Sequence, residues 1–85
     1  MKFIFCYDIS DNKTLYKVSK ELEKVGIRVQ YSVFEVDTTA EKANQILKRI
    51  SSLINPDTDR IFMYPIEKRK KEIERVGKSK NITAL

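Results

Sequence analysis

The spacing of apolar and polar residues changes along the chain, and each spacing predicts a different element. Residues 2–7 are rich in aromatic side chains and are followed by a polar turn, which is typical of a central β-strand. Side chains alternate between the two faces of a strand. The aromatic residues therefore share one face and two other residues share the opposite face: Phe3, Phe5 and Tyr7 against Ile4 and Cys6.

The residues after this strand have the period of an α-helix. Ser10 or Asp11 is expected to begin the helix, because either side chain can accept a hydrogen bond from a free amide of its first turn, and Gly26 is expected to end it. Apolar residues recur along one side of this segment: Leu15, Val18, Leu22 and Val25. Lysines recur along the opposite side: Lys13, Lys17, Lys20 and Lys24.

A second helix is expected in the middle of the chain. Thr38 or Thr39 begins it, and residues 38–41 fit a capping box, in which a threonine and a glutamate bond each other's backbone amides. The pair Asn55 and Pro56 stops the helix. Its apolar face is formed by six aliphatic residues: Ala43, Ile46, Leu47, Ile50, Leu53 and Ile54.

The segment between the two helices changes phase. Apolar residues alternate from residue 27 onward, but the alternation shifts by one position before residue 37, which a regular strand cannot do. We therefore expect either two short strands that meet near residues 31–33 or one strongly bulged strand.

A last strand pattern completes the order of elements. Residues 60–64 predict a strand that Pro65 ends, and residues 73–76 and 82–85 are candidates to extend the sheet. The order β-α-β-β-α-β predicts an α+β, ferredoxin-like fold, which is an antiparallel sheet with both helices on one face.

This fold leaves one face of the sheet uncovered. We expect the helices to cover Ile4 and Cys6, which leaves Phe3, Phe5 and Tyr7 on the open face. Monomers rarely expose an apolar patch of that size. Because two-fold dimers are the commonest oligomers, a second copy of the chain is the simplest cover, and the sequence predicts a homodimer.

The composition excludes several classes of protein. With 85 residues the chain forms one domain, which leaves little room for an enclosed substrate cavity. Cys6 is the only cysteine and there is no histidine, so internal disulfides, zinc fingers and cysteine proteases are excluded, and Cys6 is expected to be a buried, inert thiol. The longest apolar stretch, residues 3–7, is too short for a signal peptide or a membrane span, so we expect a cytoplasmic protein without a membrane partner.

Positive charge is concentrated at the end of the chain. The net charge is +5, and residues 67–80 contain seven basic and three acidic residues. We therefore divide the chain into a core at residues 1–66 and a basic tail at residues 67–85. Four consecutive basic residues in the tail are candidates to bind nucleic acid, with an acidic protein as the alternative partner: Lys68, Arg69, Lys70 and Lys71. The lysine row of the first helix either follows a duplex backbone or is simply a solvated helix face.

Three motifs resemble one known family. Tyr-Asp-Ile at residues 7–9, Arg-Val-Gln-Tyr-Ser-Val-Phe-Glu at residues 28–35 and Tyr-Pro at residues 64–65 occur in the order and spacing of the Cas-two family of CRISPR-associated proteins. The resemblance extends from Met1 to about Val76. It implies a ferredoxin-like homodimer whose sheets face one another, with a terminal strand that crosses to the partner.

The resemblance also implies a function. Members are described as magnesium-dependent endonucleases of RNA or double-stranded DNA, and as the bridge between integrase dimers during spacer acquisition in antiviral defence. By matching position, Asp8 of both subunits is the expected catalytic and Mg²⁺-binding residue. The expected supporting residues are Tyr7, Arg28, Ser32 and Phe34. Many members have an arginine cluster early in the first helix, where this chain has Lys13 and Lys17, so the grip on phosphate is expected to be looser.

The residues themselves leave alternatives open. Magnesium prefers oxygen ligands, and two Asp8 carboxylates that meet on a dimer axis would suit it, whereas an aspartate after a strand often only turns the chain or caps a helix. Tyr31 and Phe34 either stack on bases or belong to a core or interface. Three functions follow: a metal-dependent endonuclease, a non-catalytic scaffold that bridges integrase dimers on duplex DNA, and a single-stranded RNA binder, which lacks the expected glycine-aromatic signature.

Overall fold

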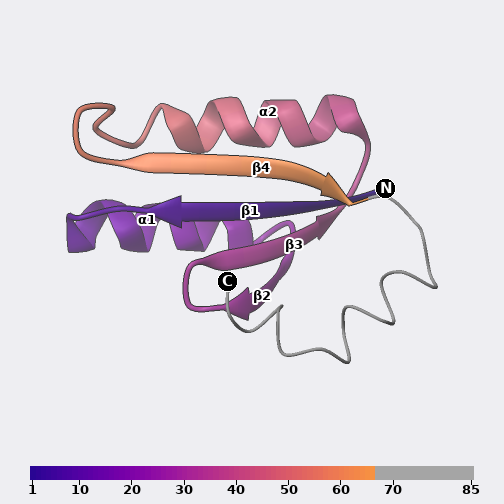
Figure 1. Ribbon diagram of the computed structural model, residues 1–85, viewed down its shortest axis with the longest axis horizontal. Coiled ribbons are helices and arrows are strands. Elements are labelled where there is room, and N and C mark those ends of the chain that lie inside the picture. The colour runs from indigo at the N-terminus through magenta and orange to yellow at the C-terminus, as the bar shows by residue number, and fades with distance from the viewer. Residues whose placement is uncertain (67–85) are drawn as a thin grey trace.

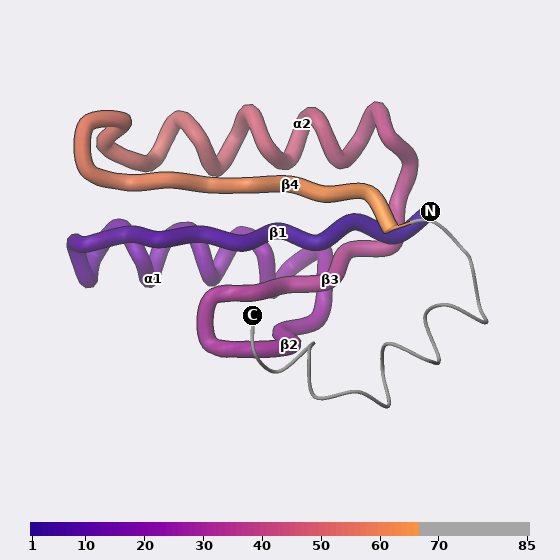
Figure 2. The backbone as a smooth tube through the Cα atoms, viewed as in Figure 1, coloured from indigo at the N-terminus to yellow at the C-terminus, as the bar shows by residue number. Residues whose placement is uncertain are grey.

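A computed structural model describes residues 1–66 of the chain. The elements follow the predicted order β-α-β-β-α-β (Figure 1). They are β1 (Lys2–Asp8), α1 (Asn12–Glu23), β2 (Ile27–Gln30), β3 (Val33–Asp37), α2 (Ala40–Ser51) and β4 (Arg60–Ile66). The strands form one sheet in the order β2-β3-β1-β4, in which every neighbouring pair is antiparallel (Figure 2). The predicted ferredoxin-like fold is confirmed, with β1 in the interior of the sheet.

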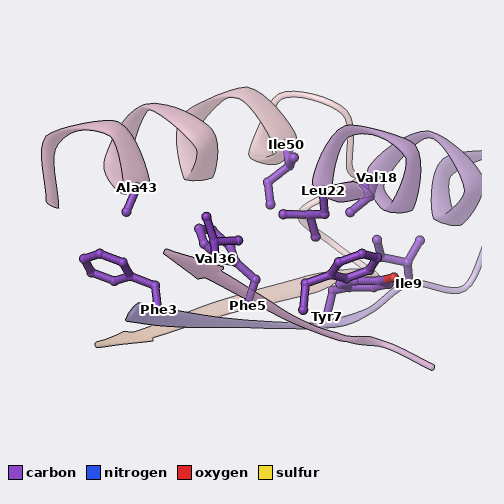
Figure 3. Close-up of a cluster of buried hydrophobic side chains, with 10 residues drawn as sticks. Phe3, Phe5, Tyr7, Ile9, Val18, Leu22, Val36, Ala43 and Ile50 are labelled. Carbon is purple, nitrogen blue, oxygen red and sulfur yellow. The ribbon is translucent and has the colours of Figure 1, made fainter. Parts of the chain in front are cut away.

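The hydrophobic core lies between the sheet and the helices, and it uses the opposite face of β1 from the one expected. Phe3, Phe5 and Tyr7 are at most 5% exposed and point toward α1 and α2 (Figure 3). Burying one phenylalanine side chain completely contributes about 1.5–3 kcal/mol to folding. The largest side chains of β1 therefore fill the space under the helices. Alternation along a strand tells which residues share a face, but not which face is covered.

Side chains from four other elements complete the core. β3 contributes Phe34 and Val36, and the loop after β1 contributes Ile9. The helices contribute Val18, Leu22, Ala43 and Ile50. Seven of the core residues are less than 2% exposed, which is the tight packing expected of a small domain: Phe5, Phe34, Leu22, Ile50, Val18, Val36 and Ala43.

The open face of the sheet carries the residues that were expected inside. Ile4 and Cys6 are only half-buried, so the prediction that the helices cover them is wrong. They pair with Tyr64 and Phe62 of β4, which are 53% and 45% exposed and whose rings stack with centroids 6.3 Å apart. Partial burial raises the pKa of the Cys6 thiol, which keeps it protonated and unreactive. The open face is therefore apolar, but with different residues from those predicted.

The first helix begins where the sequence predicts and ends for a different reason. The Asp11 carboxylate caps it by accepting hydrogen bonds from the backbone nitrogen and the hydroxyl of Thr14, at 2.9 and 3.0 Å. The helix ends at Glu23, and Gly26 does not adopt the left-handed conformation of a helix-ending glycine. A Cβ atom at Gly26 would lie 2.4 Å from the Glu35 carbonyl oxygen, so glycine is required here by the close approach of β3. Val25, expected in the apolar stripe, is 42% exposed.

The second helix has its cap at the later of the two candidate threonines. The Thr39 hydroxyl accepts a hydrogen bond from the backbone nitrogen of Lys42 at 3.1 Å, so the capping box expected at residues 38–41 does not form. The helix ends at Ser51 and not at the predicted Asn55 and Pro56, so four of the six predicted apolar residues lie in it and Leu53 and Ile54 follow it. Ala43 and Ile50 are fully buried, and the other four residues pack against the core while remaining partly exposed: Ile46, Leu47, Leu53 and Ile54.

The remaining strands resolve the open alternatives. Two short strands, β2 and β3, meet at a turn formed by Tyr31 and Ser32, and a bulge interrupts their pairing between Arg28 and Gln30. Pro65 does not end β4, since it pairs with Phe3 inside the strand. Among the described strands β4 lies at an edge of the sheet, where proline is tolerated. The strands expected at residues 73–76 and 82–85 lie outside the described residues.

None of the helices in residues 1–66 is long and apolar enough to cross a membrane.

Candidate functional site

Asp8 is the last residue of β1, and its side chain is exposed. By alternation along the strand it lies on the open face, with Ile4 and Cys6, opposite Arg60 of β4. Its carboxylate makes no hydrogen bond or ion pair with any other described residue. The helix cap that follows is provided by Asp11, so capping does not account for Asp8.

A buried aspartate fixes the loop that follows Asp8. The Asp59 carboxylate is 5% exposed and accepts hydrogen bonds from the Ser10 backbone nitrogen at 3.2 Å and from the Asn55 backbone nitrogen at 3.0 Å. The Thr58 hydroxyl donates a third bond at 3.1 Å. These hydrogen bonds lower the pKa of Asp59 below its ordinary value, and the bond from the Asn55 backbone has the largest effect. The loop after β1 is therefore tied to the loop before β4.

Three of the predicted supporting residues, Tyr7, Arg28 and Phe34, lie together on the other side of the sheet from Asp8, and Ser32 contacts Tyr7 through its backbone. The Tyr7 and Phe34 rings stack with centroids 6.3 Å apart, and the Arg28 guanidinium lies 5.1 Å from the Phe34 centroid. The Ser32 carbonyl accepts a hydrogen bond from the Tyr7 backbone nitrogen at 3.2 Å. Because Tyr7 faces the helices and Asp8 faces the open side, these residues position β1 rather than contact the Asp8 carboxylate.

Burial and charge act in opposite directions on the Tyr7 hydroxyl. Burial raises the pKa of Tyr7, and the positive charge of Arg28 partly lowers it again. The hydroxyl lies 3.5 Å from the Tyr31 carbonyl oxygen, at the outer limit of a hydrogen bond. Arg28 also pairs with Glu23 at 3.4 Å. Tyr7 is therefore a protonated side chain whose hydroxyl has one weak partner in the described part of the chain.

The lysine row of α1 is exposed along its whole length, as predicted, but its members differ. Lys24 pairs with Glu21 at 3.0 Å, and Lys20 pairs with Glu23 at 3.5 Å. Lys13 and Lys17 have no ion pair within residues 1–66. The charge that is available to bind an anion is therefore concentrated in the first half of α1. The basic cluster Lys68, Arg69, Lys70 and Lys71 lies outside the described residues.

A groove lies between α1 and the turn that joins β2 to β3. It encloses about 270 Å³ and is lined by seven residues: Tyr7, Asn12, Leu15, Tyr16, Ser19, Arg28 and Tyr31. Tyr16 and Tyr31 are 62% and 71% exposed. Of the two aromatic residues weighed from sequence, Phe34 belongs to the core, whereas Tyr31 does not.

The structure also identifies positions that the sequence did not. Asp59 lies in a polar turn, where an aspartate is common, so the sequence does not indicate that its side chain is buried and hydrogen-bonded to a distant loop. Tyr16 falls between the apolar and lysine rows of α1, and the turn between β2 and β3 forms the opposite side of its groove.

Comparison with known proteins places these features in a family. Residues 1–73 match the family model described as CRISPR associated protein Cas2. A CRISPR-associated endoribonuclease Cas2 of Rhodospirillum rubrum is 44% identical over 64 residues, which cover 75% of this chain and 52% of that protein. This chain thus spans about half the length of that relative. A CRISPR-associated endoribonuclease Cas2 of Synechocystis is 36% identical over 64 residues, which cover 75% of this chain and 70% of that protein.

Two solved structures have the same fold. The crystal structure of Streptococcus pyogenes Cas2 at pH 6.5 aligns with a TM-score of 0.76 and 31% identity, covering 86% of this chain and 94% of that chain. The crystal structure of a hypothetical protein from Thermus thermophilus aligns with a TM-score of 0.74 and 29% identity, covering 78% of this chain and 80% of that chain.

Proposed function

Because the chain belongs to the CRISPR-associated Cas2 family, we propose that it is a homodimeric, magnesium-dependent endonuclease of spacer acquisition and antiviral defence. Its substrates are the phosphodiester bonds of single-stranded RNA or double-stranded DNA, and it acts in the cytoplasm. The observation that carries the proposal is the position of Asp8, whose exposed carboxylate has no partner among the described residues and lies on the uncovered face of the sheet.

The apolar open face supports the homodimer. Ile4, Phe62 and Tyr64 lie side by side on it, and the two aromatic rings are about half exposed. Exposed apolar patches mark contact sites, and a surface that meets its own copy generates a closed two-fold dimer. A second copy packed on this face brings its own Asp8 to the same interface.

The donor set of Asp8 fits magnesium. Mg²⁺ takes oxygen ligands, retains several waters and is often held by one or two carboxylates. Within residues 1–66 of one copy no three metal-ligating side chains gather, and a dimer would supply a second carboxylate from the Asp8 of the other copy. Bound there, the ion would polarise a phosphate and lower the pKa of a water molecule.

The surrounding residues position Asp8 and the substrate. The Asp59 hydrogen bonds hold the loop after Asp8, and the packing of Tyr7 against Phe34 holds β1. Lys13 and Lys17 supply charge for a phosphate backbone without reading its sequence.

The proposal is tested by Asp8→Asn, which keeps the size of the side chain and removes its charge. We expect cleavage of labelled RNA and duplex DNA, measured across magnesium concentrations, to fall by roughly two orders of magnitude or more, as for the loss of one charge-stabilising group. Sedimentation should show the same dimer. The matched control is Glu41→Gln, an exposed carboxylate in the first turn of α2, which should cleave at the wild-type rate. Wild-type cleavage by Asp8→Asn would exclude the catalytic role.

A second candidate function is a non-catalytic scaffold that bridges integrase dimers on duplex DNA. It is favoured by the single carboxylate that each copy offers, since the Asp8 carboxylate makes no hydrogen bond or ion pair with a described side chain that could act as a general base. A scaffold predicts that Asp8→Asn still supports spacer integration with the CRISPR-associated integrase. It also predicts that integration is lost when the four consecutive basic residues of the tail are reversed to glutamate: Lys68, Arg69, Lys70 and Lys71. Unchanged integration after this reversal would contradict it.

A further inference from the structure

The groove between α1 and the β2–β3 turn combines features that the proposed endonuclease does not use. Two tyrosines from different elements, Tyr16 of α1 and Tyr31 of the turn, line it and are more than 60% exposed. Leu15 adds an apolar surface, and Asn12 adds an amide that can both donate and accept hydrogen bonds. Aromatic side chains beside a few polar groups are typical of a small ligand site.

We propose that this groove binds one unstacked base of a single-stranded nucleic acid, with the adjoining phosphates on the first half of α1. The inference rests on the proposed function only in that nucleic acid is the ligand. A volume of about 270 Å³ lies just below the roughly 300–1,000 Å³ typical of drug-sized ligands, which is room for one base. Base stacking on aromatic side chains does not require a particular base.

Both tyrosine rings have surface available for a base. Lys20 lies 5.2 Å from the Tyr16 centroid and covers one face of that ring, so the base stacks on the other face. The described residues form no stacked ring pair with Tyr31. The Tyr31 backbone carbonyl also faces the Tyr7 hydroxyl at 3.5 Å, at the turn between β2 and β3.

The polar groups of the groove can recognise a base edge or a phosphate. Arg28 uses one nitrogen toward Glu23 at 3.4 Å, which leaves other guanidinium donors for a ligand. The Tyr7 hydroxyl has only the weak bond to Tyr31, and its raised pKa keeps its proton for donation. None of the seven residues that line the groove is acidic, and Arg28, although paired with Glu23, gives the groove a cation that can face an anionic ligand.

The lysines of α1 lie where the phosphates of such a strand would run. The helix residues that line the groove recur with a helical period: Asn12, Leu15, Tyr16 and Ser19. Lys13 and Lys17 directly follow Asn12 and Tyr16, about 100° further around the helix, so they lie on the next face of the helix and not in the groove itself. Neither has an ion pair in the described part of the chain. Lys13 also attracts the Asp11 carboxylate, so Lys17 carries the less compensated charge of the two. An aromatic groove close to these cations is complementary to a base and its phosphates.

The groove also stays accessible when the proposed dimer forms. It opens beside α1, on the helix side of the sheet, whereas the second copy covers the face with Ile4 and Tyr64. A single strand can therefore occupy the groove of each copy independently of the Asp8 carboxylates.

The test measures binding without cleavage. The full chain is titrated with a short single-stranded oligothymidylate in the absence of magnesium, and tyrosine emission is recorded, since the protein has four tyrosines and no tryptophan. We expect quenching on binding, and Tyr16→Ala and Tyr31→Ala should each weaken affinity about 5- to 100-fold. Tyr16→Phe and Tyr31→Phe keep the ring and should bind within about twofold of the wild type.

Control experiments distinguish binding in the groove from nonspecific attraction to positive charge and from the proposed nuclease activity. A blunt duplex, which offers no unstacked base in its interior, should bind the alanine variants as it binds the wild type. An acidic peptide should not displace the oligonucleotide. Wild-type affinity of both alanine variants, equal losses with duplex, or displacement by the peptide would overturn the proposal. Asp8→Asn should bind the oligonucleotide normally, so failure of the nuclease proposal is read separately from failure of this one.

Discussion

Replacing Gly26 by alanine tests the close packing between the end of α1 and the sheet. The added Cβ atom would lie 2.4 Å from the Glu35 carbonyl oxygen and 2.7 Å from a methyl carbon of Val36. The Glu35 backbone cannot easily move away, because it pairs with Ile4 on one side and Ile27 on the other. We therefore expect the substitution to strain β3 rather than to be absorbed by a flexible side chain.

The magnitude follows from two opposing terms. Overpacking a tightly packed site costs about 1–3 kcal/mol, and contact with a backbone atom places Gly26→Ala near the upper end. Alanine restricts the unfolded chain more than glycine does, which offsets about 0.4–1 kcal/mol. The free energy of unfolding should therefore fall by about 2 kcal/mol. For a domain of this size that lowers the melting temperature by roughly 8–16 °C.

The measurement is urea unfolding followed by circular dichroism, at one fixed protein concentration because association alters apparent stability. The matched control is Val25→Ala, at a neighbouring position that is 42% exposed, which should change stability by no more than about 1 kcal/mol. If Gly26→Ala is as stable as the control, the close approach of β3 does not restrict this position and the reasoning fails.

Two further predictions concern the loop after β1 and the open face. The hydrogen bonds to Asp59 lower its pKa in the folded state. The stability that they provide is therefore present above the unfolded-state pKa and is lost as the pH falls through the lowered folded-state pKa. Asp59→Asn should be less stable than the wild type at neutral pH, and the difference should shrink in acid. A pH-independent difference in urea unfolding would contradict this. Phe62→Lys should shift the sedimenting species from dimer to monomer while the far-ultraviolet spectrum stays unchanged, and an intact dimer would show that the open face is not the interface.

Much of the fold could be predicted because its signals are local. Asp11 and Thr39 were among the candidate caps, and each needs only a side-chain oxygen within one helical turn. The phase change before Phe34 is likewise visible in the sequence, because the strand period is two. The covered face of β1 was predicted wrongly, since the choice between Phe5 and Cys6 depends on how much space the helices leave, which no local pattern reports.

Some features of the candidate site could also be predicted from local sequence signals, and others could not. The exposed position of Asp8 at the end of a strand follows from the residues around it, and its suggested role came from the family resemblance. The hydrogen bonds of Asp59 join Ser10 to Asn55, two residues far apart in the sequence, so the hydrophobic periodicity of the sequence cannot predict them. Gly26 appeared to be a helix terminator, whereas its actual constraint is a neighbouring strand.

Tyr7 and Asp8 are neighbours on β1, so the packing of Tyr7 in the core determines the face of the sheet on which Asp8 lies. Successive residues of a strand point to opposite sides, so a slip of one residue would bring the carboxylate under the helices and expel the aromatic ring. Insertion or deletion of a single residue inside this strand should therefore lower stability, and under the proposed role of Asp8 it should abolish cleavage as well. The buried aromatic side chains of β1 that stabilise the domain therefore also determine on which side of the sheet the Asp8 carboxylate lies.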